Sequence, residues 1–317
     1  MQDPLLTSAK DLLNGPRVSV GIPCYNRPQG LHAMLECVRH QTYKNLEIIV
    51  SDNCSPDEQI PKMMAEFVHA DKRIQYFRQE KNVGPTSNFN FVRSKASGEY
   101  FVWAADDDAW KETYIEKCLE QFQAHPSLVM CYSEAVKSAV GGQPEILLAS
   151  DIATVGMKRM AGLKKFLKNQ HRNIEFYGLM KTHIARRYHF ENLFGEDQIF
   201  LLFLALHGEV GRTEPGLFIN GAGFAGTSVE NTVCSGGLQE SNIYWGYIFL
   251  SMNSMRMILK YDFRLSVIDK VYVILFLIRR VLSPRFRLEI RRGAKKFVRD
   301  WLRLRFFDSS SQRRENL

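Results

Sequence analysis

Three adjacent aspartates, Asp106 to Asp108, follow an apolar run and form a cluster of carboxylates that could bind a ligand. Adjacent carboxylates repel one another, so grouping them costs stability unless a cation neutralises their charge. Mg²⁺ and Mn²⁺ prefer carboxylate oxygens and complete their coordination with water and with the oxygens of a bound phosphate. The triplet therefore indicates either a divalent cation site or an acidic turn in which Asp108 caps a helix that begins near Lys111.

Polar residues also follow two earlier apolar runs. The sequence IPCYNRP places Pro23, Tyr25 and Asn26 in a turn, where the tyrosine ring could stack on a planar ligand. The sequence SDNCSPDE places Asp52 at the end of the next run, where its carboxylate could accept a hydrogen bond from the ring N–H of a base. The S-P-D-E sequence that starts at Ser55 favours a helix capping box as an alternative use of this segment.

A third turn follows in the sequence KNVGP. Asn82 and Gly84 favour a tight turn in which backbone amides can approach a ligand, and Pro85 can begin a helix. No G-x-G-x-x-G sequence follows the first apolar run, which argues against a nicotinamide or flavin nucleotide as the ligand.

The elements that must position these residues alternate between short apolar runs and segments with helical periodicity. The runs predict strands over 17–22, 46–51, 73–77, 100–104 and 128–132, and the periodic segments predict helices over 29–40, 57–70, 86–96 and 111–124. Such alternation predicts an α/β fold with a Rossmann-like, mostly parallel sheet and helices on both faces. Ligands of such sheets bind beyond the carboxyl ends of the strands, and each polar motif falls just after a predicted strand.

Composition separates the chain into a body and a basic tail. The net charge is +8, but residues 256–317 carry 17 Lys and Arg against 6 Asp and Glu, which gives +11 and leaves −3 for the remainder. This asymmetry favours a polyanionic partner for the tail, either an anionic membrane surface or a nucleic acid. An amphipathic helix is predicted over 286–301, whereas the apolar run 271–278 is too short to span a membrane. The six cysteines form no C-x-x-C pair and, with no predicted signal peptide, fit a reducing cytosol.

The motifs VSVGIPCYN, LEIIVSDNCSPD, KNVG and GEYFVWAADDDAW occur in this order and together resemble family 2 glycosyltransferases, inverting enzymes with the GT-A fold. The resemblance is strong over residues 17–135 and continues more weakly to about 230. It implies a sugar-nucleotide donor, a UDP-sugar by family frequency, bound with Mg²⁺ or Mn²⁺.

The resemblance also implies a role for each motif residue. Pro23, Tyr25 and Asn26 would border the base of the donor, Asp52 would hydrogen-bond that base, and Asn82 would shape the floor of the pocket. Separately, the triplet would be a DxD-type motif, with Asp107 as the direct metal ligand, Asp106 as a contact to the ribose or the metal shell, and Asp108 as a further ligand or only a cap. Many members carry an aspartate where this chain has Ala105, so which aspartate coordinates the metal stays open.

A later motif, FGEDQIFLLFLAL, supplies the candidate catalytic base. Inverting transfer needs a general base that takes the proton of the acceptor hydroxyl. Family members often carry an E-D pair here, which implies Asp197 as the base and Glu196 as the alternative. First-turn acids that stabilise the helix dipole are the other interpretation. The preceding segment FYGLMKTHIARR also resembles the family.

These observations predict a lead-in over 1–16, a catalytic domain over 17–235 and a basic amphipathic helical extension over 236–317. Within the catalytic domain, 17–110 would bind donor and metal, and 111–235 would bind the acceptor. We expect a glycosyltransferase of the hexosyl type, peripheral on the cytoplasmic face of a membrane, that acts on a lipid-linked glycan in surface polysaccharide synthesis.

Two other functions remain as alternatives. A nucleotidyltransferase that forms sugar nucleotides has a similar sheet, but it usually shows a Gly-rich basic loop after the first strand. A non-catalytic protein that binds nucleic acid or membrane through the tail would leave the acidic triplet unexplained. We therefore expect no nucleic-acid partner, and a homo-oligomer is left open.

Overall fold

The computed structural model describes residues 15–137, 146–170, 174–193, 195–221, 241–263 and 265–281. The chain divides into two compact units. The first comprises Met1–Glu191 and Phe200–Gly226, and the second comprises Asn192–Ile199 and Thr227–Leu317. The amphipathic helix predicted over 286–301 lies outside the described residues.

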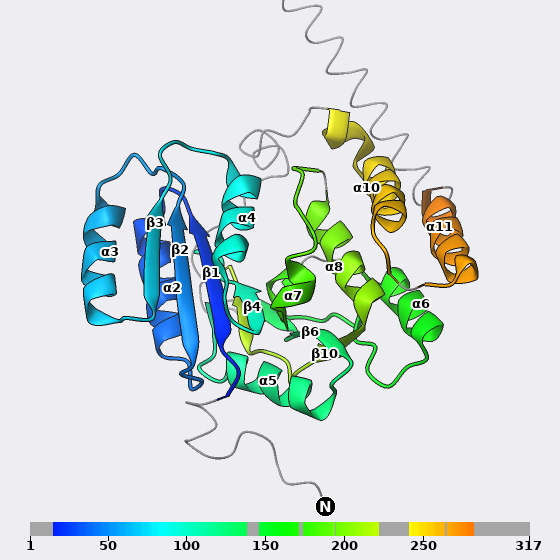
Figure 1. Ribbon diagram of the computed structural model, residues 1–317, viewed down its shortest axis with the longest axis horizontal. Helices are drawn as coiled ribbons and strands as arrows, with labels where there is room; N and C mark the ends of the chain where they lie inside the picture. Colours follow the sequence, from blue (N-terminus) through cyan, green and yellow to red (C-terminus); the bar gives the residue numbers. More distant parts are fainter. Residues whose placement is uncertain are drawn as a thin grey trace, which may run out of the picture. The chain divides into compact units, whose positions relative to one another are not determined.

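A seven-stranded sheet, counted over the described residues, is the centre of the first unit, with strand order β10-β6-β9-β4-β1-β2-β3 (Figure 1). All neighbouring strands are parallel except β9, which runs antiparallel to both β4 and β6. The predicted mostly parallel sheet is therefore confirmed. The strands are β1 (Val18–Cys24), β2 (Leu46–Asp52), β3 (Ile74–Arg78), β4 (Tyr100–Trp103), β6 (Leu128–Tyr132), β9 (Leu179–Lys181) and β10 (Glu209–Arg212).

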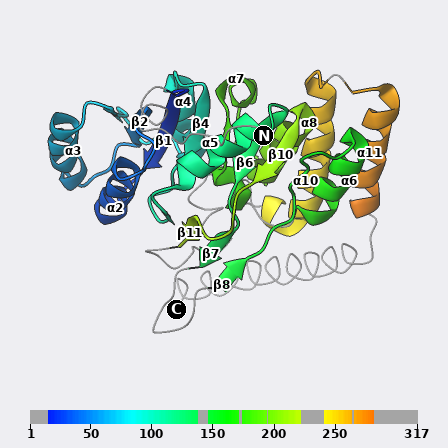
Figure 2. The same ribbon diagram turned by 90° about the horizontal axis from the view of Figure 1, so that it is seen from below.

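Helices cover both faces of this sheet, as predicted. The helices α2 (Pro28–Arg39) and α3 (Gln59–Ala70) lie on one face, and α4 (Pro85–Lys95) lies on the other (Figures 1 and 2). Successive strand residues point to opposite faces, and β2 and β4 bury apolar residues on both of their faces. The other helical segments of this part of the chain are α5 (Tyr114–Ala124), α6 (Arg159–Asn169), η1 (Ile174–Tyr177), α7 (Thr182–Ala185) and α8 (Glu196–His207).

A small second sheet joins the acidic triplet to a distant part of the chain. Its order is β5-β11-β7-β8. Strand β5 (Ala109–Trp110) follows the triplet directly and pairs antiparallel with β11 (Phe218–Asn220). Strands β7 (Ala135–Lys137) and β8 (Ile146–Leu148) complete the sheet.

An aromatic cluster fixes the strand that leads into the triplet. The indole of Trp103, the last residue of β4, is fully buried. Its ring stacks on Phe176 with the ring centroids 4.6 Å apart, and the rings of Phe101, Phe190 and Phe200 contact it edge-on. Aromatic contacts of this kind add to the stability gained by burial alone, so the end of β4 is firmly anchored.

The second unit contains the first residues of α8 and the helices α10 (Ser241–Lys260) and α11 (Val267–Val281), which contact one another. None of the helices in the described part of the chain is both long and apolar enough to span a membrane.

Candidate active site

The carboxyl ends of β1, β2, β3 and β4 bring the four predicted motifs to one edge of the sheet. The turn after β1 meets the turn after β2, where the backbone N–H of Asn26 donates to Ser55 Oγ at 2.8 Å. Pro23 is still within β1, whereas Tyr25 is 44% exposed beyond it. An exposed ring at this edge is available for stacking on a planar ligand.

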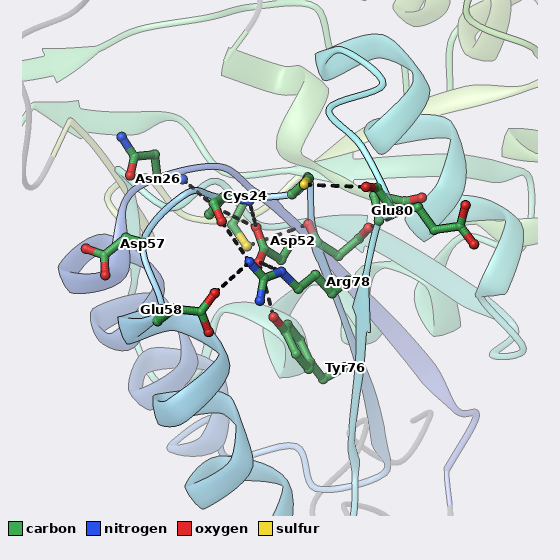
Figure 3. A network of polar contacts seen from close by, with 12 residues as sticks. Cys24, Asn26, Asp52, Asp57, Glu58, Tyr76, Arg78 and Glu80 are labelled. Carbon is green, nitrogen blue, oxygen red and sulfur yellow. Dashed lines mark hydrogen bonds and ion pairs between the residues drawn. The ribbon is translucent and has the colours of Figure 1, made fainter.

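Asp52, the last residue of β2, is fully buried and is the centre of a polar network (Figure 3). Its Oδ1 accepts a hydrogen bond from the backbone N–H of Ser55 at 2.9 Å, and its Oδ2 accepts from Tyr76 Oη at 3.2 Å. The guanidinium of Arg78 lies 3.6 Å from Oδ2 and also pairs with Glu58. The Asp52 carboxylate therefore holds together the ends of β2 and β3.

The capping box predicted to start at Ser55 is wrong. Helix α3 begins at Gln59, and its first backbone N–H is bonded by Asp57 Oδ1 at 2.8 Å rather than by Ser55. The Ser55 hydroxyl instead donates to Asp52 and accepts from Asn26. A side chain expected to serve the helix therefore serves the edge of the sheet.

The turn after β3 is attached to the same edge. The Asn53 side chain donates to Asn82 Oδ1 at 2.9 Å and accepts from the backbone N–H of Val83 at 2.9 Å. Gly84 has a φ of +80°, a conformation that costs glycine little, and it is followed by the first residue of α4 as predicted. Asn82 therefore lies beside the β2 turn.

In the acidic triplet, two carboxylates converge on the guanidinium of Arg27. Arg27 Nη1 lies 3.0 Å from Asp106 Oδ1 and 3.3 Å from Asp107 Oδ2. The side chain of Asp106 is 10% exposed and that of Asp107 is 36% exposed, so only the second is open to solvent to any extent. Sequence reasoning did not assign Arg27 to the site, because a single basic residue after a turn carries no distinctive pattern.

The third aspartate points to a different partner. Asp108 Oδ1 accepts hydrogen bonds from the backbone N–H of Gly221 at 2.9 Å and from Asn220 Nδ2 at 3.1 Å. The alternative that Asp108 caps a helix is wrong, because α5 begins at Tyr114 and the residue before it is Thr113. Asp108 ties the triplet to the end of β11.

Burial shifts the pKa values of the two enclosed aspartates upward. Burial raises the pKa of Asp106 to about 6, although the charge of Arg27 opposes the rise. Burial likewise raises the pKa of Asp108 to about 7, against the hydrogen bond from Gly221 and with support from the charge of Asp107. Carboxyl groups with such pKa values bind protons readily near neutral pH, so a bound cation and protons would compete for them.

Asp106 and Asp107 fit a divalent cation. Their oxygens already converge on one positively charged atom, they are hard ligands of the kind Mg²⁺ and Mn²⁺ prefer, and Asp107 is accessible. Within the described ranges, no three His, Cys, Asp or Glu side chains are grouped so that they could hold a metal ion by themselves. The remaining coordination positions would therefore fall to water and to a phosphate-bearing ligand.

Gly30 is a second residue that sequence reasoning missed. It lies in the first turn of α2, and a Cβ built on it would be 2.0 Å from the backbone carbonyl oxygen of Asp106. Real Cβ contacts are essentially never shorter than 3.0 Å. The absence of a side chain at this position therefore allows α2 to lie directly against the triplet.

The candidate base residues begin α8 within the second unit. Glu196 is 7% exposed, and its Oε2 accepts the backbone N–H of Leu193 at 3.1 Å, which closes the turn before the helix. Asp197 is partly exposed, and its Oδ1 accepts the backbone N–H of Gln198 at 2.8 Å. Glu196 thus has a structural role at the helix start, and Asp197 is the more accessible of the two.

Similarity to known proteins agrees with this geometry. An uncharacterized glycosyltransferase of Rickettsia bellii is 40% identical over 108 residues, which make up 34% of this chain and 15% of that protein. The GalNAc(5)-diNAcBac-PP-undecaprenol beta-1,3-glucosyltransferase of Campylobacter jejuni is 37% identical over 94 residues, 29% of this chain and 30% of that protein. The chain thus matches less than a third of the length of either relative.

The crystal structure of S. aureus TarS 1-349 in complex with UDP-GlcNAc shares the fold, with a TM-score of 0.57 and 16% identity over 89% of this chain and 80% of that chain. The fold is therefore GT-A, as the sequence predicts. The sequence profile of glycosyl transferase family 2 matches residues 19–194. Because this match spans more than half of the chain, the protein belongs to glycosyl transferase family 2.

Proposed function

We propose that the protein transfers a sugar from a nucleotide-diphosphate sugar, with UDP as the nucleotide, to a hydroxyl group of a lipid-linked glycan during surface polysaccharide synthesis. The transfer inverts the configuration of the anomeric carbon. The observation that carries this proposal is the convergence of Asp106 and Asp107 on the positively charged guanidinium of Arg27, beside the turns that follow β1 and β2. The named activity of the Campylobacter jejuni relative supports a lipid-linked acceptor, and the UDP-GlcNAc bound to TarS supports the donor.

The donor base lies against the turns after β1 and β2 in the proposed complex. The exposed ring of Tyr25 stacks on the base, and Pro23 and Asn26 border it. Asp52 accepts the ring N–H of the base in exchange for one of its present donors, since its carboxylate already accepts three hydrogen bonds at this edge. Asn82 closes the floor of the pocket from the neighbouring turn.

The diphosphate of the donor lies against the acidic triplet in the proposed complex. Asp107 would hold Mg²⁺ or Mn²⁺, and Asp106 would contact the ribose or the metal shell. When bound, the metal stabilises the negative charge that develops on the departing diphosphate. Arg27 contributes a fixed positive charge at the same place, since its guanidinium is held by both carboxylates.

Asp197 acts as the general base. The acceptor oxygen attacks the anomeric carbon as its proton moves to the Asp197 carboxylate, and the bond from that carbon to the diphosphate breaks on the opposite side. Its partial exposure supports this role, whereas the buried Glu196 carboxylate is engaged in the turn before α8.

A thermal-shift screen of sugar nucleotides with and without Mn²⁺ tests the proposal on the full chain. We expect one UDP-sugar to raise the melting temperature only with the metal, and Asp107→Asn to weaken donor binding by about tenfold or more. Asp151→Asn is the control, because Asp151 is an exposed carboxylate that is also paired with a cation, 2.7 Å from Lys165 Nζ. The proposal fails if no nucleotide stabilises the protein with Mn²⁺, or if Asp107→Asn behaves like Asp151→Asn.

With a lipid-linked acceptor the enzyme works at a membrane as a peripheral protein, and we assign it to the cytoplasmic face. The charge of +11 between residues 256 and 317 supports an anionic membrane surface as the partner.

A further inference from the structure

Helix α11 has an exposed apolar face. Five aliphatic side chains on this 15-residue helix are between 39% and 80% exposed, although such side chains gain stability from burial. At about 100° per residue, they fall within an arc of about 100° and form one continuous stripe. We call this surface the α11 stripe; it consists of Val267, Ile268, Val271, Leu275 and Ile278.

The stripe is not the face that α11 uses inside its own unit. Val273 and Leu277 are almost fully buried, and they lie on a different side of the helix from the stripe. Helix α10 contacts α11, and its own residues Leu250, Met257 and Ile258 are buried as well. A helix with apolar residues on two sides is normally covered on both, so the stripe is a surface that requires a partner.

The charges around the stripe indicate the kind of partner. Around the helix, Arg279 lies next to one edge of the stripe and is exposed, and Lys270 lies next to the other edge. The acidic residue of α11, Asp269, lies on about the opposite side of the helix from the middle of the stripe. An apolar stripe with cations at both edges complements an anionic bilayer, because aliphatic side chains enter the acyl boundary while Lys and Arg reach the headgroups.

We propose that the α11 stripe lies in the interfacial region of an anionic membrane and holds the enzyme there. The proposal identifies the surface by which the enzyme contacts the membrane. It rests on the proposed function only for the identity of the acceptor in that membrane. A second copy of the chain is a less suitable occupant, because an isologous contact through this stripe would bring the flanking Lys270 and Arg279 of both copies together. At an anionic lipid surface the aliphatic side chains are covered and the flanking basic residues meet negative headgroups instead of one another.

Co-sedimentation of the full chain with vesicles of phosphatidylcholine, alone or with about a third phosphatidylglycerol, tests the proposal. We expect binding to the anionic vesicles, weakened by high salt, and little binding to the neutral ones. Leu275→Glu should lower the partition coefficient by about tenfold or more, because it replaces an inserted side chain with a charge of the membrane's own sign. Glutamate forms helices well, and Leu275 is 58% exposed, so the fold should tolerate the change.

Leu147→Glu is the matched control. Leu147 is a 47% exposed leucine in β8, in the other unit, and the substitution changes the net charge equally. The proposal requires this variant to bind vesicles within about twofold of the unmodified chain. Equal binding by Leu275→Glu and Leu147→Glu would overturn it, as would no binding to anionic vesicles at low salt.

Two further measurements separate the remaining explanations. Light scattering after size exclusion, without lipid, would overturn the proposal if the unmodified chain is a dimer that Leu275→Glu dissociates. Donor-induced thermal stabilisation should be the same in Leu275→Glu as in the unmodified chain. If no donor stabilises the unmodified chain but the chain still binds anionic vesicles, the proposed function is refuted and the proposed membrane surface is not.

Discussion

Replacing Gly30 with alanine tests whether the close approach of α2 positions the acidic triplet. The added Cβ would lie 2.0 Å from the carbonyl oxygen of Asp106, so helix and triplet would have to separate by about 1 Å to reach the shortest normal contact. Alanine favours a helix over glycine by about 1 kcal/mol, and overpacking costs about 1–3 kcal/mol. The free energy of unfolding should therefore fall by no more than about 2 kcal/mol, a loss of a few degrees in melting temperature.

The effect on the site should be much larger than the effect on stability. A displacement of about 1 Å can cost on the order of 10²-fold in rate, because reacting groups leave their productive geometry. We expect Gly30→Ala to weaken Mn²⁺-dependent donor binding by about tenfold and to lower transfer by about 10²-fold. The assays are titration of the donor with Mn²⁺ and single-turnover transfer.

Gly162→Ala is the control for this substitution. Gly162 is also in a helix, α6, and a Cβ there would meet Thr154 Cβ at 3.1 Å, a tight contact that a small shift relieves. This variant should bind donor as the unmodified chain does. Donor binding by Gly30→Ala within about twofold of Gly162→Ala would show that the contact does not position the triplet.

Two other substitutions address the stability of the sheet and the identity of the base. Burial alone would raise the pKa of Glu47, but hydrogen bonds from Ser19, Ser97 and Gly98 outweigh it and hold the pKa below 4.5. The Glu47 carboxylate therefore stabilises the fold above pH 4.5, and this stability is lost as pH falls through the lower pKa of the folded state. Chemical unfolding should show Glu47→Gln less stable at pH 7 by about 1–3 kcal/mol and a smaller difference near pH 3; an equal difference at both pH values would contradict this role. Asp197→Asn should lower transfer by about 10²–10⁴-fold with donor binding unchanged, and a rate near that of the unmodified chain would place the base elsewhere.

Local sequence patterns were sufficient to predict five strands of the main sheet and the edge where the motifs meet. The runs that become β1, β2, β3, β4 and β6 are apolar and rich in β-branched or aromatic residues, so the predicted and observed bounds differ by at most two residues. Strands β9 and β10 were not predicted, because runs of three and four residues are too short to show a period.

The parts of the site that were missed depend on contacts between distant residues. The partners of Asp108 are 112 and 113 residues further along the chain, so a helix cap nearby was the simpler local interpretation. Arg27 is 79 residues from Asp106, and nothing in the sequence marks the pair. The importance of Gly30 follows only from how closely its helix approaches the triplet.

The tie between Asp108 and the end of β11 has a consequence for dissecting this protein. A chain shortened to end at residue 194 would contain every residue that matches the family profile. It would nevertheless lack β10, which leaves the N–H and C=O groups along one side of β6 unpaired, and it would lack β11, the partner of β5. The Asp108 carboxyl group would also lose the hydrogen bonds from Asn220 and Gly221. The smallest fragment that can keep the acidic triplet in place therefore extends at least to residue 221.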